Sequence, residues 1–421
     1  MHIDHLSLMG FRTYGFLDLS LRPGLTVMVG PNGVGKTNIV EAVDYCANLA
    51  SHRVSTDAPV VQVGQERAYI RARLIRAGQQ TVMELEITPG KANRVRINRA
   101  APVRAREALG ICRTVLFSPE DLQLIKGEPG ARRRFLDDLA VALRPVVAGY
   151  RQDYERVLRQ RNALLKSLRQ SQRRGPPGEN DQATREVWDQ QLIALGARIM
   201  HARFQVLAAL QPQADRAYAQ LTEGAKGLGF SYDSAALGQR DGADLESLAA
   251  LKPAQLGQML EAAREQRGAE EIERGMSLIG PHRDEIQLTL GGIPAKGYAS
   301  HGETWSYALA LRLGSWYVHR HDDDAAGASP ILILDDVFAE LDARRRARLA
   351  EIVAEAEQVL VTCAVEEDLP EQLPQARRVV RVSPGEAVIV DDQEPGSDDD
   401  SAPRSSWSRA QPDQQGEGTT S

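Results

Sequence analysis

The segment that most constrains this chain is Gly30-Pro31-Asn32-Gly33-Val34-Gly35-Lys36-Thr37, which fits the pattern G-x-x-x-x-G-K-[ST]. It follows an apolar stretch at residues 25–29 that is typical of a strand, and it precedes residues 38–43, which can open a helix. Glycines let backbone N–H groups turn toward phosphate oxygens, and a helix N-terminus favours negative charge. The segment therefore predicts a phosphate-binding loop, or Walker A motif, in an α/β protein.

Two side chains of this loop have the chemistry that ATP and Mg²⁺ require. The ammonium group of Lys36 can reach the β- and γ-phosphates, and the hydroxyl of Thr37 can ligate Mg²⁺. We therefore predict ATP and Mg²⁺ as cofactors. All eight residues from Gly30 to Thr37 are predicted to bind the nucleotide, with Thr37 also at the metal and Lys36 also in catalysis.

A second apolar stretch, residues 331–334, ends in the carboxylates Asp335 and Asp336. Taken alone, such a pair is more often a helix N-cap. Beside a Walker A motif it is typical of a Walker B strand, in which Asp335 holds the Mg²⁺ shell and Asp336 accepts a proton from the attacking water. Asp335 and Asp336 are therefore predicted as catalytic residues, with Asp335 also a metal ligand.

The third motif is Ser300-His301-Gly302-Glu303, which precedes a predicted helix over residues 304–313. The Ser hydroxyl, the Gly N–H and the helix dipole point the same way, so the motif favours an anion. It lies about 30 residues before the Walker B strand, where ABC-type ATPases use a Ser-Gly motif on the nucleotide of the opposite subunit. Ser300, Gly302 and Glu303 are therefore predicted to bind ATP across an ATP-dependent homodimer.

The order of the remaining patterns indicates one ATPase head built from both ends of the chain. The first 115 residues favour strands, including a hairpin over 68–75 and 81–88, and strand patterns return at 286–290 and 359–362. Between them, residues 131–174 and 184–221 have helical periodicity, with breaks at Pro145, at the Pro/Gly-rich segment 175–181 and near Pro212.

The predicted fold class is therefore α/β: an ABC-type P-loop ATPase head, a mixed sheet with flanking helices, with a helical arm inserted between Walker A and Walker B. The predicted divisions are 1–125 (head, with Walker A), 126–272 (helical arm, lobe II), 273–390 (head, with the Ser-x-Gly-Glu motif and Walker B) and 391–421 (disordered acidic tail).

Charge is unevenly distributed along the chain. The net charge is −6, and residues 391–421, with eight acidic residues and two arginines, carry all of the excess. Residues 131–174 carry twelve basic and four acidic residues, which favours contact with DNA phosphates, although a solvated helix face is an equal alternative. The candidate DNA-binding side chains are Arg132, Arg133, Arg134, Arg156, Arg159 and Arg161.

The chain resembles the RecF family, a short-armed branch of the SMC-type ABC ATPases. The resemblance covers about residues 1–390 and rests on five runs: Gly10-Phe11-Arg12-Thr13-Tyr14, Gly33 to Asn38, Phe117-Ser118-Pro119-Glu120-Asp121-Leu122, Gly280-Pro281-His282-Arg283-Asp284, and Leu334 to Asp342. It implies a cytoplasmic protein that binds ATP, dimerises with ATP, hydrolyses it slowly with stimulation by DNA, and clamps single-stranded, gapped or duplex DNA. It also implies cooperation with RecR and RecO to load RecA, in repair, replication restart and the SOS response.

Two residues depart from the wider ABC pattern. The position after the Walker B aspartate is usually Glu but here is Asp336, which is one methylene shorter, and no His follows residues 359–363. Both features favour slow hydrolysis, which suits a switch. The alternatives are an ATPase-linked DNA nuclease, a small-molecule P-loop kinase and a scaffold that nucleotide only supports.

The composition gives no sign of secretion or of a membrane partner. No run of apolar residues approaches the roughly 20 that span a bilayer, and the N-terminal residues lack the pattern of a signal peptide. Cys46, Cys112 and Cys363 are expected to be buried thiols in a reducing compartment, because they are odd in number and have no metal-ligand spacing.

Overall fold

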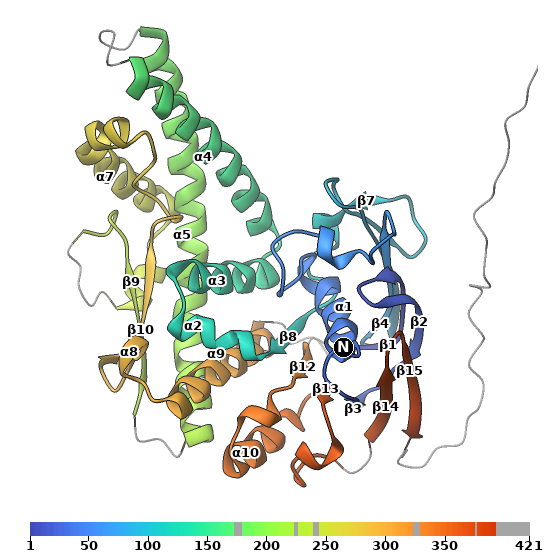
Figure 1. Cartoon of the computed structure of the whole chain (residues 1–421). Helices are drawn as coiled ribbons and strands as arrows, with labels where there is room; N and C mark the ends of the chain where they lie inside the picture. Colours follow the sequence, from blue (N-terminus) through green and yellow to red (C-terminus); the bar gives the residue numbers. More distant parts are fainter. Residues whose placement is uncertain (172–178, 223–225, 239–243, 323–328, 375–376, 393–421) are drawn as a thin grey trace, which may run out of the picture.

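We analysed a computed structural model of the 421-residue chain, which describes residues 1–171, 179–222, 226–238, 244–322, 329–374 and 377–392. Two six-stranded sheets form a head, and a pair of long helices extends from it as an arm (Figure 1). The three cysteines are buried free thiols, as predicted. This arrangement confirms the predicted architecture, a mixed sheet with flanking helices and an inserted helical arm.

The first sheet combines strands from both ends of the chain in the order β15-β14-β3-β13-β12-β8. Its strands are β3 (Gly24–Val29), β8 (Thr114–Phe117), β12 (Ile331–Asp335), β13 (Gln358–Cys363), β14 (Arg377–Ser383) and β15 (Glu386–Asp392). All pair in parallel except β15, which pairs antiparallel with β14 at the edge. The carboxyl ends of β3 and β12 therefore lie at one edge of the sheet, where α/β folds place ligands.

The second sheet is antiparallel and comes from the first quarter of the chain, in the order β2-β1-β4-β5-β6-β7. Its strands are β1 (His2–Phe11), β2 (Tyr14–Ser20), β4 (Ala68–Arg76), β5 (Gln79–Ile87), β6 (Arg94–Ile97) and β7 (Val103–Arg104). The β4–β5 pair is the predicted hairpin. Helix α1 (Lys36–Asn48) packs its apolar side chains into the same core as the inner faces of both sheets.

The remaining helices pack into a second core that continues into the arm. They are α2 (Leu122–Lys126), α3 (Pro129–Leu143), α4 (Val146–Ser171), α5 (Glu179–Thr222), α6 (Leu245–Ala249), α7 (Pro253–Arg274), α8 (Ala295–Tyr298), α9 (His301–Asp322) and α10 (Ala343–Val353). A small sheet, β9 (Leu228–Asp233), β10 (Glu285–Leu290) and β11 (Ile293–Pro294), includes the predicted strand at 286–290. Short 3₁₀ turns lie at 58–60, 105–108, 119–121, 338–340 and 366–368.

Of two predicted helix breaks at prolines, the structure confirms one and contradicts the other. Pro145 separates α3 from α4, as predicted. The interruption predicted near Pro212 is wrong, because α5 continues through Pro212 to Thr222. A proline inside a helix costs about 3 kcal/mol, but α5 packs there against α9 so closely that a Cβ on Gly314 would lie 2.9 Å from the backbone nitrogen of Ala214. This packing offsets the local cost.

Two other predicted segments lie partly outside the residues that the structure describes. The Pro/Gly-rich turn at 175–181 lies partly outside them, and α5 already begins at Glu179. Asp391 and Asp392, predicted to begin the disordered tail, belong instead to β15, where Asp391 pairs with Val379 of β14. Residues 393–421 lie outside the described part of the chain.

Among the described residues, the segment Gln182–Thr222 of α5 is long and apolar enough, by length and composition alone, to cross a membrane. Half of that apolar window is buried inside the protein. It also contains Arg203, whose buried guanidinium donates to both carboxylate oxygens of Asp137 on α3, at 2.7 and 3.0 Å. We interpret this segment as the central core helix that joins the arm to the head.

A buried ion network holds the three arm helices together. The guanidinium of Arg161 on α4, which is 1% exposed, donates to Asp189 on α5 at 2.5 Å and to Glu271 on α7 at 2.6 Å. It also donates to the hydroxyl of Ser277 at 2.7 Å. Burial disfavours a charge, but these carboxylates outweigh it and raise the pKa of Arg161. The Arg161 side chain therefore joins all three helices.

Replacing this arginine should loosen the arm. We expect Arg161→Ala to lower the free energy of unfolding by about 3–5 kcal/mol, because the buried Glu271 loses its cationic partner while Asp189 keeps only Arg264 and Arg185. Urea denaturation measures this loss. Arg159→Ala removes an exposed arginine two residues away on the same helix and should change stability by less than about 0.5 kcal/mol. Similar losses in both variants would contradict the central role of Arg161.

Candidate nucleotide-binding site

The Walker A loop leaves β3 and encloses its own lysine. The Lys36 ammonium donates to the carbonyl oxygens of Gly30 at 2.8 Å and Pro31 at 3.2 Å, and to Asn32 Oδ1 at 3.4 Å. Gly33 and Gly35 have φ of 84° and 118°, in the region that favours glycine. Helix α1 begins directly after Gly35, so its free N–H groups point toward the loop. This is the geometry of an anion site.

Neighbouring segments leave no room for larger side chains at two of the loop glycines. A Cβ on Gly30 would lie 2.3 Å from the carbonyl oxygen of Val382 on β14. A Cβ on Gly35 would lie 2.8 Å from both Thr13 Oγ1, in the β1–β2 turn, and Tyr14 Oη, at the start of β2. The loop is therefore shaped by strands from both ends of the chain.

The predicted metal ligands converge. The Thr37 hydroxyl donates to Asp335 Oδ1 at 3.0 Å, although the two residues are 298 positions apart in the sequence. Asp335 is 4% exposed, and burial raises its pKa because the carboxylate loses solvation. A divalent cation between Thr37 and Asp335 would compensate that buried charge, so these residues fit the Mg²⁺ that the motifs imply.

The structure adds Thr362 on β13, which sequence reasoning missed. Its hydroxyl donates to Asp335 Oδ1 at 2.7 Å and accepts the backbone N–H of Asp336 at 2.9 Å. Asp336 has φ of 51°, a left-handed conformation that is uncommon for a non-glycine residue. Thr362 thus fixes the carboxylate of one Walker B aspartate and the backbone of the other. The one available signal was a hydroxyl residue within the apolar run of 359–363.

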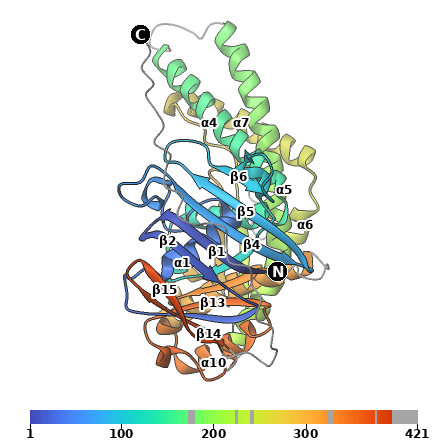
Figure 2. The same ribbon diagram turned by 90° about the vertical axis from the view of Figure 1, so that its right-hand side faces the viewer.

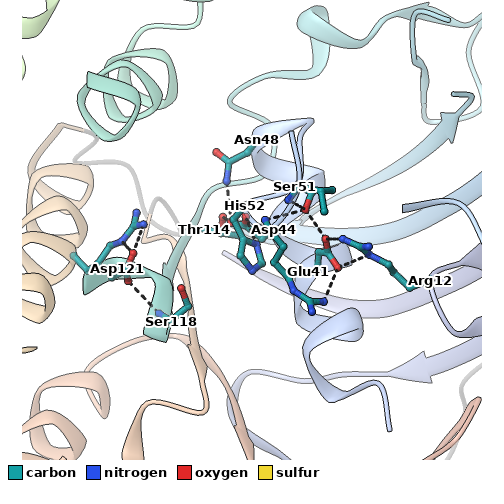
Figure 3. A network of polar contacts seen from close by, with 12 residues as sticks. Arg12, Glu41, Asp44, Asn48, Ser51, His52, Thr114, Ser118 and Asp121 are labelled. Carbon is teal, nitrogen blue, oxygen red and sulfur yellow. Dashed lines mark hydrogen bonds and ion pairs between the residues drawn. The ribbon is translucent and has the colours of Figure 1, made fainter. Parts of the chain in front are cut away.

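A second polar network anchors α1 behind the loop (Figure 3). Glu41 is fully buried, and its carboxylate accepts two hydrogen bonds from the Arg12 guanidinium, at 2.9 and 2.5 Å, and one from the Ser51 hydroxyl at 2.5 Å. One turn later, Asp44 accepts from the Thr114 hydroxyl on β8 at 2.8 Å. These contacts give a structural reason for Arg12, whose motif contributed to the family resemblance.

The Ser-x-Gly-Glu motif forms the N-terminus of α9. The Ser300 hydroxyl accepts the Glu303 N–H at 3.3 Å and Glu303 accepts the Ser300 N–H at 2.8 Å, which is a capping box. Lys226 donates to Glu303 at 2.6 Å, and this bond, followed by those with Ser300, lowers the pKa of Glu303 to about 2. The Ser300 side chain is exposed.

One chain does not bring all the predicted ATP residues together. Lys36, Thr37, Asp335 and Asp336 lie around one loop. Helix α8, which leads into the Ser-x-Gly-Glu motif, lies at the left of Figure 1, while α1, which follows the Walker A loop, lies toward the right. Ser300, Gly302 and Glu303 are therefore presented on a different side of the same head.

The six candidate DNA-binding arginines differ in burial and form three groups. Arg132 and Arg161 are buried. Arg132 is paired bidentately with Glu285 at 2.9 and 3.0 Å. Their burial removes both from the predicted DNA surface, because Arg132 joins α3 to β10 and Arg161 joins the arm helices. Arg133 is half-buried and donates to the carbonyl oxygen of Asp284 at 2.7 Å. The exposed members are Arg134, Arg156 and Arg159.

Comparison with known proteins decides the family. The family model for the RecF/RecN/SMC N-terminal domain matches residues 2–389. The DNA replication and repair protein RecF of Pseudarthrobacter chlorophenolicus is 53% identical over 401 residues, covering 91% of this chain and 98% of that protein. The RecF of Streptomyces avermitilis is 54% identical over 380 residues, covering 90% and 98%.

This chain belongs to the RecF family. A solved structure described as the recombination mediator protein RecF-ATP in the RecFOR pathway has a TM-score of 0.78 and 24% identity, and covers 93% of this chain and 98% of that one. An SMC head domain with a coiled coil from Pyrococcus yayanosii has a TM-score of 0.51 at 12% identity. Both likenesses concern the fold, and they agree with the head and arm described above.

The role of Thr362 in the nucleotide-binding site can be tested by mutation. Thr362→Val removes a donor to a buried carboxylate, a hydrogen bond worth about 1.5–3 kcal/mol, and we expect Mg²⁺-dependent ATP affinity to fall at least about tenfold. Titration with a fluorescent ATP analogue, with and without Mg²⁺, measures the change. The control is Thr26→Val on adjacent β3, since the buried hydroxyl of Thr26 has no partner within the described residues. Equal affinities in the two variants would argue against the role of Thr362.

Proposed function

We propose that this protein is an ATP-dependent, DNA-binding recombination mediator that acts in DNA replication and repair. The observation that carries the proposal is the junction of Thr37, Asp335 and Thr362 beneath a complete Walker A loop, in a chain of the RecF family. The names of its relatives, DNA replication and repair protein RecF, agree with it.

In this proposal, residues Gly30 to Thr37 hold the phosphates of ATP, and Lys36 exchanges its loop acceptors for phosphate oxygens. Thr37 and Asp335 would hold Mg²⁺, which would neutralise charge on the β- and γ-phosphates when bound. Asp336 orients the attacking water and accepts its proton. Its shorter side chain makes hydrolysis slow, so the protein is a weak, DNA-stimulated ATPase that works as a switch.

ATP joins two copies of the chain. The exposed Ser300 and the half-buried Gly302 and Glu303 of one head contact the nucleotide held by the Walker A loop of its partner, since the N-terminus of α9 carries a favourable dipole. The closed dimer clamps DNA at single-strand gaps, and hydrolysis reopens it. RecR and RecO act with it to place RecA, in the cytoplasm.

The arm supplies DNA contacts through its exposed arginines, Arg134, Arg156 and Arg159, with Arg133 beside them.

Two alternative functions make different predictions. An ATPase-linked nuclease would cleave single-stranded DNA with Mg²⁺, and a nucleotide-supported scaffold would bind ATP without turnover.

The experiment that tests the function measures DNA binding with ATP, ADP and no nucleotide, on gapped, duplex and single-stranded DNA. We expect ATP to favour both dimerisation and DNA binding, and affinity to fall steeply between about 50 and 200 mM salt. Arg156→Glu/Arg159→Glu should weaken binding. The same affinity in all three nucleotide states would refute an ATP-gated clamp.

A second experiment tests whether ATP hydrolysis opens the dimer. Asp336→Asn keeps the side-chain shape but cannot accept the proton, so ATP turnover should fall by at least about a hundredfold, the lower range for a general base. Dimers on DNA should live longer in proportion, as measured by dissociation after dilution. Unchanged dimer lifetimes would show that hydrolysis does not open the clamp.

A further inference from the structure

The outer face of the antiparallel sheet is open to solvent, with α1 behind it (Figure 2). Toward its β7 edge this face is strongly basic. A surface cavity of about 620 Å³ is lined by Arg67, Lys91, Arg94 and Arg104, with Glu86 as its one carboxylate. Glu86 is already paired with Arg67, at 3.0 Å. Most of the positive charge around the cavity is therefore uncompensated by the lining residues.

The strand register adds to this imbalance. Arg94 lies between Glu86, its partner in the β5–β6 ladder, and Arg104, its partner in the β6–β7 ladder. The Glu86 carboxylate is shared with Arg67, so one negative charge faces these arginines. Like charges directly opposite one another destabilise a strand pair. Both side chains are exposed, and within the described residues neither makes an ion pair. An anion between the two guanidinium groups would convert this repulsion into attraction.

The turn after β6 adds a fourth arginine to the same edge. The Ala100 N–H donates to the Ile97 carbonyl at 3.0 Å, and both central residues are left-handed, Asn98 with φ of 51° and Arg99 with φ of 62°. This is the type I′ geometry, which favours glycine at the position of Arg99. A side chain there costs roughly 1–2 kcal/mol. Arg99 is exposed at the tip, where it is free to contact a ligand.

We propose that this β7 edge, defined as Arg67, Lys91, Arg94, Arg99 and Arg104, binds the sugar-phosphate backbone of DNA. The inference rests on the proposed function, which supplies DNA as the polyanion. The basic side chains extend over strands spaced about 4.8 Å apart, so from β4 to β7 they span about 14 Å. An open surface of that width fits several consecutive phosphates, whereas a single nucleotide would leave much of it uncompensated.

The β7 edge is also joined to the nucleotide-binding half of the head. Asn93, next to Arg94, donates to the Tyr45 hydroxyl at 2.8 Å and to Asp57 at 2.9 Å. Tyr45 is buried on α1, the helix that begins at Lys36. The loop that presents Lys91 and Arg94 is thereby fixed to the helix that follows the Walker A motif.

Reversing one charge at the β7 edge should lower the affinity for DNA without lowering the stability of the fold. Arg104→Glu places a carboxylate opposite Arg94, so the melting temperature should stay the same or rise. Affinity of the full-length protein with ATP for a fluorescent duplex should fall about tenfold, and the slope of log K against log salt should drop by about 0.9 for each phosphate that the variant no longer neutralises. Arg99→Gly should likewise raise stability, by relieving the left-handed arginine, and lower DNA affinity.

Arg267→Glu is the matched control, because it makes the same charge change on an exposed residue of α7, and it should leave DNA binding unchanged. Unaltered DNA affinity in Arg104→Glu and Arg99→Gly would overturn the inference, and a loss confined to Arg156→Glu/Arg159→Glu would assign DNA to the arm alone. If the wild-type protein binds ATP but no DNA in any nucleotide state, the proposed function fails together with the inference.

Discussion

The site depends on the hydrogen bond between Thr37 and Asp335, because it joins residues from the two ends of the chain. It exists only because β3 pairs in parallel with β13, which pairs in parallel with β12. These pairings bring the end of the Walker A strand and the end of the Walker B strand to one edge. Between the two motifs the chain contributes β8 to this same sheet, and the arm that follows β8 is an insertion that the sheet tolerates.

The arm is stabilised by a different principle. Its helices are joined by arginines buried with carboxylates, Arg161 with Asp189 and Glu271, and Arg203 with Asp137. Such groups are costly to bury and more costly to leave unpaired, so they favour one arrangement of helices over others. Part of the excess of arginine in the arm sequence therefore serves internal ion pairs. Only the exposed arginines are available to bind a polyanion.

Motifs whose function is local were readable from the sequence, because a phosphate loop or a buried strand is specified by neighbouring residues. The Walker A loop, the β4–β5 hairpin and the break at Pro145 are examples. What depends on distant packing was not readable. Pro212 stays helical because α9 supports it, Arg161 is buried although its neighbours are charged, and Thr362 reaches Asp335 only after two parallel strands pair. The opposition of Arg94 and Arg104 likewise needs the strand register.

The unbroken path of α5 through Pro212 has a mechanical consequence. The helix has 44 residues, which at 1.5 Å per residue makes a rod about 66 Å long. Its C-terminal part packs on α9 at Gly314, without space for even a Cβ, and α9 begins with the residues that would face the partner's nucleotide in the proposed dimer. The two helices can only move as one lever. A rotation of about 5° at the dimer interface would displace the far end of the rod by about 6 Å, so closure around ATP would be amplified at the tip of the arm.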